Sequence, residues 1–92
     1  MKEKLEKFIR ENQLNFNSYG SSLNGAYTVL CGYADHVGAS KKAVKEAVQA
    51  CTGVEQLPQE SKKELDKVYK FTTTFNYGKW WTREEASRLY KI

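Results

Sequence analysis

Regularly spaced apolar residues dominate the stretch from Ser22 to Cys51. Its first half repeats them at steps of three and four, as on one face of an α-helix: Leu23, Tyr27, Leu30, Ala34 and Val37. The second half keeps the same spacing with Ala43, Val44, Ala47, Val48 and Cys51. Between them, Gly38 suits the left-handed residue that ends a helix, and Ser40 is a good N-cap for the next. The pattern predicts two helices that bury each other in a central hairpin, with the other helices packed around it.

Shorter amphipathic segments on either side of the hairpin predict three more helices. Residues 2–13 form the first, and its inward residues are Leu5, Phe8 and Ile9. Another follows Pro58, with Ser61 and Glu64 as a capping box near its start. Its inward residues are Leu65, Val68, Tyr69 and Thr72. A second capping box, Thr82 with Glu85, predicts a last helix that reaches Ile92.

Two segments leave alternatives open. Asn12 to Asn24 is rich in Asn, Ser and Gly, which favour turns, so we expect a loop anchored by Leu14, Phe16 and Tyr19. Such a long loop can carry a function or be a plain connector. The sequence FTTTF at 71–75 is either the end of a helix or a short strand, although no strand partner is evident.

Composition places the chain among small cytosolic proteins. The 92 residues predict one domain, 1–92, and the spacing predicts an all-α fold of about five short helices around the central hairpin. No run approaches the length of a membrane span, and the charged start MKEKLEKFIR is unlike a secretory signal. Cys31 and Cys51 are expected as reduced core residues, and contact between them stays open.

Candidate catalytic and metal-binding residues are few, and we expect neither an enzyme nor a cofactor. His36 is the single histidine, and Cys31 lies five residues before it, on a different helix face. The two cysteines and this histidine lack the CxxC or HxxxH spacing of zinc sites. No glycine-rich phosphate loop is present.

The corner of the hairpin matches the spacing of a helix-turn-helix motif. Ala34 holds the place of the small residue, Gly38 that of the turn and Val44 that of the β-branched residue. The apolar supports are Leu30, Tyr33, Val37, Ala39 and Ala47. The second helix is expected to expose Lys41, Lys42, Lys45, Glu46 and Gln49. Any helix pair with a short glycine corner passes the same test, so a purely structural hairpin is the alternative to DNA binding.

Basic and aromatic residues alternate between Lys67 and Arg83. The chain has a net charge of +4 and twelve aromatic residues, more than a small helical core needs. Basic groups among aromatics can neutralise phosphates and stack on bases, or form the hot spots of a protein interface. Tyr69 and Trp81 are expected in the core. The surface candidates of this segment are Tyr77, Lys79, Trp80 and Arg83.

The segments AYTVLCGYA (26–34) and NYGKWW (76–81), with Ala86 and Tyr90, resemble small phage-encoded inhibitors of the anti-CRISPR kind. The resemblance spans residues 23–92. It implies a cytosolic, non-enzymatic protein of the bacterial host cell that docks on a large nucleoprotein. Many such inhibitors are acidic mimics of DNA, whereas this chain is basic, so it would occlude a surface or touch bound nucleic acid.

Two functions therefore remain in view, and a bacterial immunity or scaffold protein is a third possibility. The first is an inhibitor that docks on a CRISPR effector and blocks its nucleic-acid binding or action, without a small-molecule substrate or a membrane. The second is a helix-turn-helix regulator that reads DNA with the 41–50 helix. The residues expected to bind partner or nucleic acid are Lys41, Lys42, Lys45, Tyr77, Lys79, Trp80 and Arg83.

Overall fold

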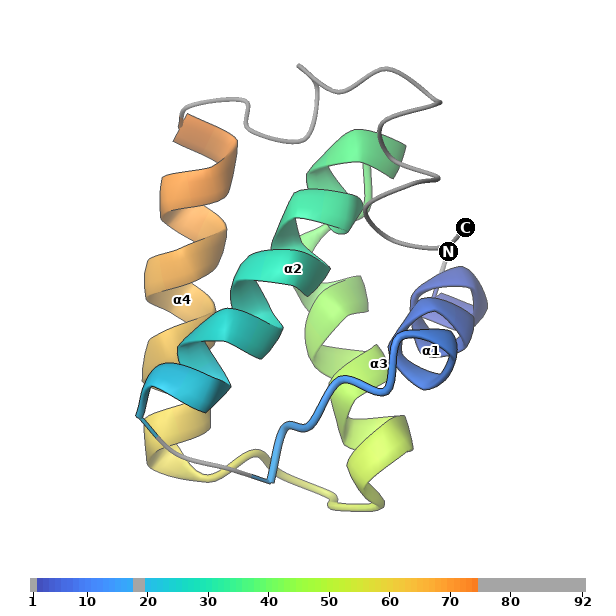
Figure 1. The fold of residues 1–92 in the computed structure, drawn as a ribbon, viewed down its shortest axis with the longest axis vertical. Coiled ribbons are helices and arrows are strands. Elements are labelled where there is room, and N and C mark those ends of the chain that lie inside the picture. The colour runs from blue at the N-terminus through green and yellow to red at the C-terminus, as the bar shows by residue number, and fades with distance from the viewer. Residues whose placement is uncertain (1, 18–19, 75–92) are drawn as a thin grey trace.

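The computed structural model describes residues 2–17 and 20–74, and most of this part of the chain is helical (Figure 1). The helices are α1 (Lys2–Glu11), α2 (Ser21–Val37), α3 (Lys41–Thr52) and α4 (Gln59–Thr74). The described residues contain no β-strand, so the predicted all-α class is confirmed for them. The predicted fifth helix, 82–92, lies outside the described residues.

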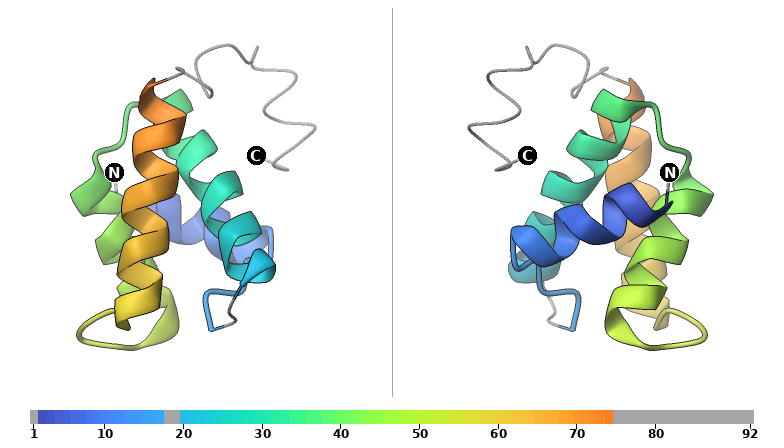
Figure 2. Two further views of the ribbon diagram at one scale, coloured as in Figure 1. Left: turned by 90° about the vertical axis from the view of Figure 1, so that its left-hand side faces the viewer. Right: turned by 90° about the vertical axis from the view of Figure 1, so that its right-hand side faces the viewer.

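Helices α2 and α3 form a V that opens away from their shared corner (Figure 2). Helix α4 covers one side of the V and packs mainly along α2, whereas α1 crosses the other side and packs mainly along α3. The prediction that α2 and α3 bury mainly each other is wrong. The short turn points the two helices apart, so their apolar faces diverge and are covered by α4 and α1.

The corner itself forms as its sequence predicts. Gly38 is left-handed, with a φ of 77°, and ends α2. The N–H of Ala39 then donates to the carbonyl of Ala34 over 2.7 Å. The Ser40 hydroxyl accepts from the N–H of Ala43 over 3.2 Å, which caps α3. At the other end of α3, Gly53 is also left-handed, with a φ of 76°.

The core lies inside the V and takes side chains from all four helices. Leu5, Phe8 and Ile9 of α1 are buried, as predicted. The Phe8 ring stacks on Tyr33 of α2, with ring centroids 4.1 Å apart. The residues with the least exposed area and the largest volume are Tyr27, Phe8, Leu5, Leu30, Val44, Val48 and Cys31.

Two polar contacts join α2 to α4 inside this apolar packing. The hydroxyl groups of Tyr27 and Ser61 lie 2.5 Å apart, and both residues are buried. One turn away on each helix, the Asn24 amide donates to the Glu64 carboxylate over 2.6 Å. The predicted capping box is therefore wrong: Ser61 and Glu64 lie inside α4 and face α2, and the helix already begins at Gln59.

The loop before α2 is shorter than predicted. Helix α2 begins at Ser21: the Asn24 N–H donates to the carbonyl of Gly20 over 3.1 Å, and the Asn24 side chain contacts α4. Of the predicted loop anchors, Phe16 is buried against Tyr27 and Leu14 packs on the core. Tyr19 lies outside the described residues.

The threonine run at the end of α4 is helical. The hydroxyl of Thr72 donates to the carbonyl of Val68 over 2.7 Å, and that of Thr73 to the carbonyl of Tyr69 over 2.8 Å. These bonds return to the preceding turn, as threonine does within helices. The alternative of a strand is wrong for residues 71–74.

Candidate functional site

Three exposed lysines and one exposed phenylalanine lie on the side of α4 that faces away from the core. Lys63, Lys67 and Lys70 follow at steps of four and three, which places them on one face of the helix. Phe71 lies next to them on the same face, and 57% of its area is exposed. We call these four residues the outer face of α4. In the left view of Figure 2, α4 is the described helix nearest to the viewer.

The acidic residues of α4 contact other helices or lie at its start. The Asp66 carboxylate forms an ion pair with Lys41 of α3, with 3.0 Å between the lysine nitrogen and the carboxylate oxygen. The Glu64 carboxylate accepts a hydrogen bond from the Asn24 amide of α2. Glu60 is in the first turn, at the far end of the helix from Phe71. Asp66 is exposed between Lys63 and Lys67, but Lys41 offsets its charge, so the middle and the end of the outer face keep a net positive charge.

The predicted DNA-reading helix is α3, and part of its polar surface is engaged within the protein. Lys42 is exposed, and Lys41 forms the ion pair with Asp66. Lys45 is half-buried, as are Glu46 and Gln49. The prediction that all five polar residues of α3 are exposed is therefore wrong for these three.

The helix-turn-helix spacing nevertheless corresponds to a real corner. Ala34 and Val44 are both fully buried on its inner side, as the motif requires. The Gln49 side chain donates to the carbonyl of Glu55 over 2.6 Å, and so ties α3 to the following loop. The helix-turn-helix corner is therefore present, but Lys41 and Gln49 form contacts within the protein.

The start of α3 lies beside α4. The Tyr69 hydroxyl donates to the carbonyl of Ala39 over 3.0 Å, and Lys41 reaches Asp66 three residues earlier on α4. Tyr69, which was predicted in the core, is half-buried. The lysines of α3 and the outer face of α4 thus sit on adjacent helices. Tyr77, Lys79, Trp80 and Arg83, the other predicted binding residues, lie outside the described residues.

The cysteines are both free, and neither is an activated thiol. Burial raises the pKa of the Cys31 thiol to about 12. Burial also raises the pKa of Cys51, whose sulfur lies 3.9 Å from the carbonyl of Glu6. A raised thiol pKa keeps the sulfur protonated and weakly nucleophilic at neutral pH. Within residues 2–17 and 20–74, no three His, Cys, Asp or Glu side chains group as metal ligands.

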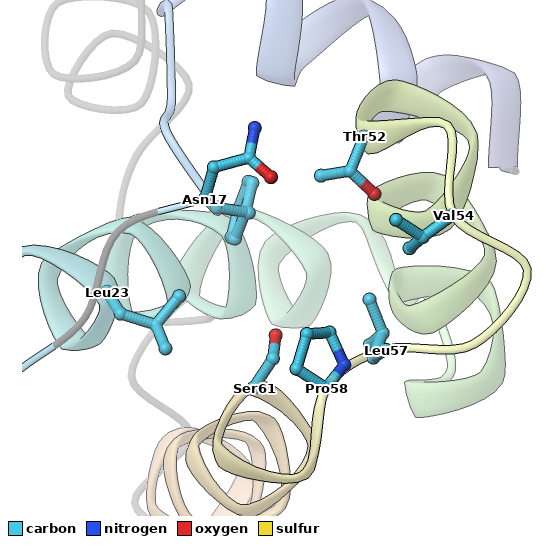
Figure 3. Close-up of a pocket in the computed structure, with 8 residues that line it drawn as sticks. Asn17, Leu23, Thr52, Val54, Leu57, Pro58 and Ser61 are labelled. Carbon is cyan, nitrogen blue, oxygen red and sulfur yellow. The ribbon is translucent and has the colours of Figure 1, made fainter.

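A small cavity lies at the base of the molecule, between the start of α2, the end of α3 and the start of α4 (Figure 3). Its volume is about 80 Å³. Leu23, Leu57 and Pro58 contribute apolar walls, and Asn17 and Ser61 contribute polar groups. Binding pockets for small organic ligands measure about 300–1,000 Å³, so this cavity has room only for a few waters.

Sequence reasoning placed Lys67, Lys70 and Phe71 in a basic and aromatic segment, but it missed Lys63 and the common face. The spacing of Lys63, Lys67 and Lys70 opposite the apolar residues of α4 was a usable signal. The contacts that occupy Asp66 and Glu64 had no signal in the sequence, because they join residues 25 and 40 positions apart.

Comparison with known proteins gives no match for this chain: no family model, no curated protein and no solved structure corresponds to it. The described helices include none with the length and apolar character needed to cross a bilayer.

Proposed function

We propose that this protein is a small, non-enzymatic inhibitor of the anti-CRISPR kind, which acts in the bacterial cytoplasm. It docks on a nucleic-acid-targeting effector complex and blocks the binding or the action of nucleic acid there. The observation that supports this proposal is the outer face of α4, where a row of three exposed lysines ends at Phe71, on a helix whose opposite side packs against the core.

Such a face suits docking on a complex made of protein and nucleic acid. An aromatic side chain that is desolvated on docking is a common source of interface affinity. Lysines around it speed association with an acidic surface and add salt dependence. The chain that follows α4 continues this composition with Tyr77, Lys79 and Trp80.

The experiment is a capture from bacterial lysate by the tagged protein, run with and without nuclease and identified by mass spectrometry. We expect the protein subunits of one nucleic-acid-targeting complex to be retained in both arms. Purified protein added to that complex should then reduce its nucleic-acid binding or cleavage. Capture of nucleic acid alone, lost after nuclease treatment, would contradict the proposal.

The alternative function is a helix-turn-helix regulator, and the corner between α2 and α3 supports it. The left-handed Gly38, the capped start of α3 and the buried Val44 all meet the requirements of the motif. The Lys41–Asp66 ion pair counts against it, because a phosphate contact by Lys41 would have to replace that pair. Tight, sequence-selective binding of the purified protein to a palindromic duplex would favour this alternative.

A further inference from the structure

We propose that the outer face of α4 binds the phosphodiester backbone of nucleic acid through Lys63, Lys67 and Lys70. This inference deepens the proposed function, on which it rests for the identity of the nucleoprotein. It assigns to α4 a direct contact with the nucleic acid of that complex. The predicted contact residues Lys41, Lys42 and Lys45 of α3 are not needed for it.

The spacing of the three lysines suits a phosphate chain. An α-helix rises about 1.5 Å per residue, so Lys63 and Lys70 are about 10 Å apart along the axis. Along the axis of a B-form duplex each strand advances about 3.4 Å per phosphate, so the row matches the axial length of about three phosphates. Lysine ammonium groups on flexible stems reach phosphates without a fixed bidentate geometry. The row therefore fits a backbone contact without base readout.

The electrostatics of α4 favour the same partner. Asp66 could offset the charge of Lys67 or Lys70, but its carboxylate contacts Lys41 instead. Glu64 likewise faces α2 through Asn24. Glu64 is thereby drawn toward α2, whereas Asp66 stays exposed within the lysine row and has its charge offset by Lys41. A polyanion can approach this side along the whole lysine row, with Glu60 at one end.

Phe71 gives the lysine row a second feature that suits a nucleic acid. The ring is exposed and lies next to Lys70 at the C-terminal end of the row. Aromatic rings beside backbone-binding lysines stack on unpaired bases in many single-strand binding proteins. An acidic peptide would use the lysines and would have no base for the ring.

The test compares three full-length variants that each lose three positive charges. The first carries K63Q, K67Q and K70Q on α4, and the second carries K41Q, K42Q and K45Q on α3. The third is a control with K2Q, K4Q and K7Q on α1. Glutamine keeps a similar side-chain length and helix propensity. Binding to a labelled single-stranded oligonucleotide and to its duplex is followed by fluorescence anisotropy over a range of salt concentrations.

We expect the α4 variant to lose most of the salt dependence of binding. Three phosphate contacts on duplex DNA contribute a slope of about 2.7 in log K against log salt. That slope corresponds to an about 40-fold loss of affinity between about 50 and about 200 mM salt, and for a single strand to about 20-fold. The α1 control should retain the salt dependence of the unmodified protein.

Three outcomes would overturn the inference. If the α1 control loses as much affinity for the oligonucleotide as the α4 variant, binding depends only on the net charge of the protein. If the α3 variant alone loses binding, the helix-turn-helix corner is the nucleic-acid surface. If poly-glutamate competes as well as an oligonucleotide of equal charge, the face recognises acidic polymers in general. The lysate capture is independent of these readings, so retained protein subunits would uphold the inhibitor function even if α4 did not bind nucleic acid.

Discussion

The contact between Tyr27 and Ser61 is a polar interaction of two single residues that is buried between two helices. Its two hydroxyl groups lie 2.5 Å apart, between α2 and α4. Burial raises the pKa of Tyr27 while the bond to Ser61 opposes that rise. A buried hydroxyl without a partner loses its hydration without compensation, so each of the two groups depends on the other.

We expect Ser61→Ala to lower the free energy of unfolding by about 1–3 kcal/mol, because it leaves the Tyr27 hydroxyl buried without this partner. Tyr27→Phe should have an effect of similar size. The double variant should cost clearly less than the sum, since neither hydroxyl is then left unpaired. Urea denaturation of the four proteins measures these differences. Additive costs would show that the two hydroxyls do not depend on each other.

Cys31 makes a prediction about alkaline pH. Its pKa is raised by burial from 9.0 to about 12 in the folded protein. Between these values the unfolded chain releases a proton that the folded protein keeps, so stability falls as pH rises through this window. Below about pH 9 both states are protonated and the group has no effect. The slope contributed by one group approaches about 1.4 kcal/mol per pH unit.

Cys31→Ala should remove this contribution. Urea denaturation from about pH 8 to about pH 11 should give a shallower decline for the variant than for the unmodified protein. Part of the decline should persist, because burial also raises the pKa of Tyr27 and Tyr33. Parallel declines in both proteins would contradict the assignment to Cys31.

At the scale of elements, the sequence predicted what depends on neighbours along the chain. The left-handed Gly38 and the cap at Ser40 are local features, and both form as expected. The start of α2 and the roles of Ser61 and Glu64 were predicted wrongly. The contacts between α2 and α4 decide them, and turn or capping propensity at these positions is weaker than those contacts.

In the candidate site, too, local features were predictable from the sequence and contacts between helices were not. Spacing placed Lys41 and Lys42 at an exposed helix start, because the apolar residues of α3 fix which side is inward. Spacing could not show that α4 lies beside this start and engages Lys41 through Asp66. Which helices become neighbours depends on the packing of the whole core.

The cap of α3 gives the prediction at this scale. Ser40→Ala should cost about 1 kcal/mol, because the N–H of Ala43 loses its side-chain acceptor. Ser40→Asn is the matched control and should be nearly neutral, since asparagine caps a helix about equally well. Thermal unfolding of both variants measures the difference. A lower melting temperature for Ser40→Asn as well would mean that something other than capping is lost.

At the scale of the whole molecule, two exposed apolar side chains lie at opposite ends of α4. Phe71 is near its C-terminal end and is 57% exposed, whereas Val54 precedes its start and is 37% exposed. Val54 borders the small cavity at the base, away from the outer face of α4. Substituting each of these two residues in turn therefore tests which end of α4 forms the docking surface.

We expect Phe71→Ala to weaken binding to the captured complex by about 2 kcal/mol, as removal of a buried interface anchor does. Val54→Ala should leave binding unchanged. Both variants should unfold within about 0.5–1 kcal/mol of the unmodified protein, because both side chains are partly or largely exposed. Titration calorimetry with the purified complex measures the affinities. A larger loss for Val54→Ala would place the docking surface at the opposite end.

The pairing of α1 with α3 and of α2 with α4 also bears on how the chain folds during synthesis. Each of the first two helices is synthesised before its principal neighbour. Their apolar faces are covered by α3 and then α4, so the native packing cannot be complete before α4 is available. A fragment that ends in the turn after Val37 would therefore hold α1 and α2 without the principal neighbour of either helix.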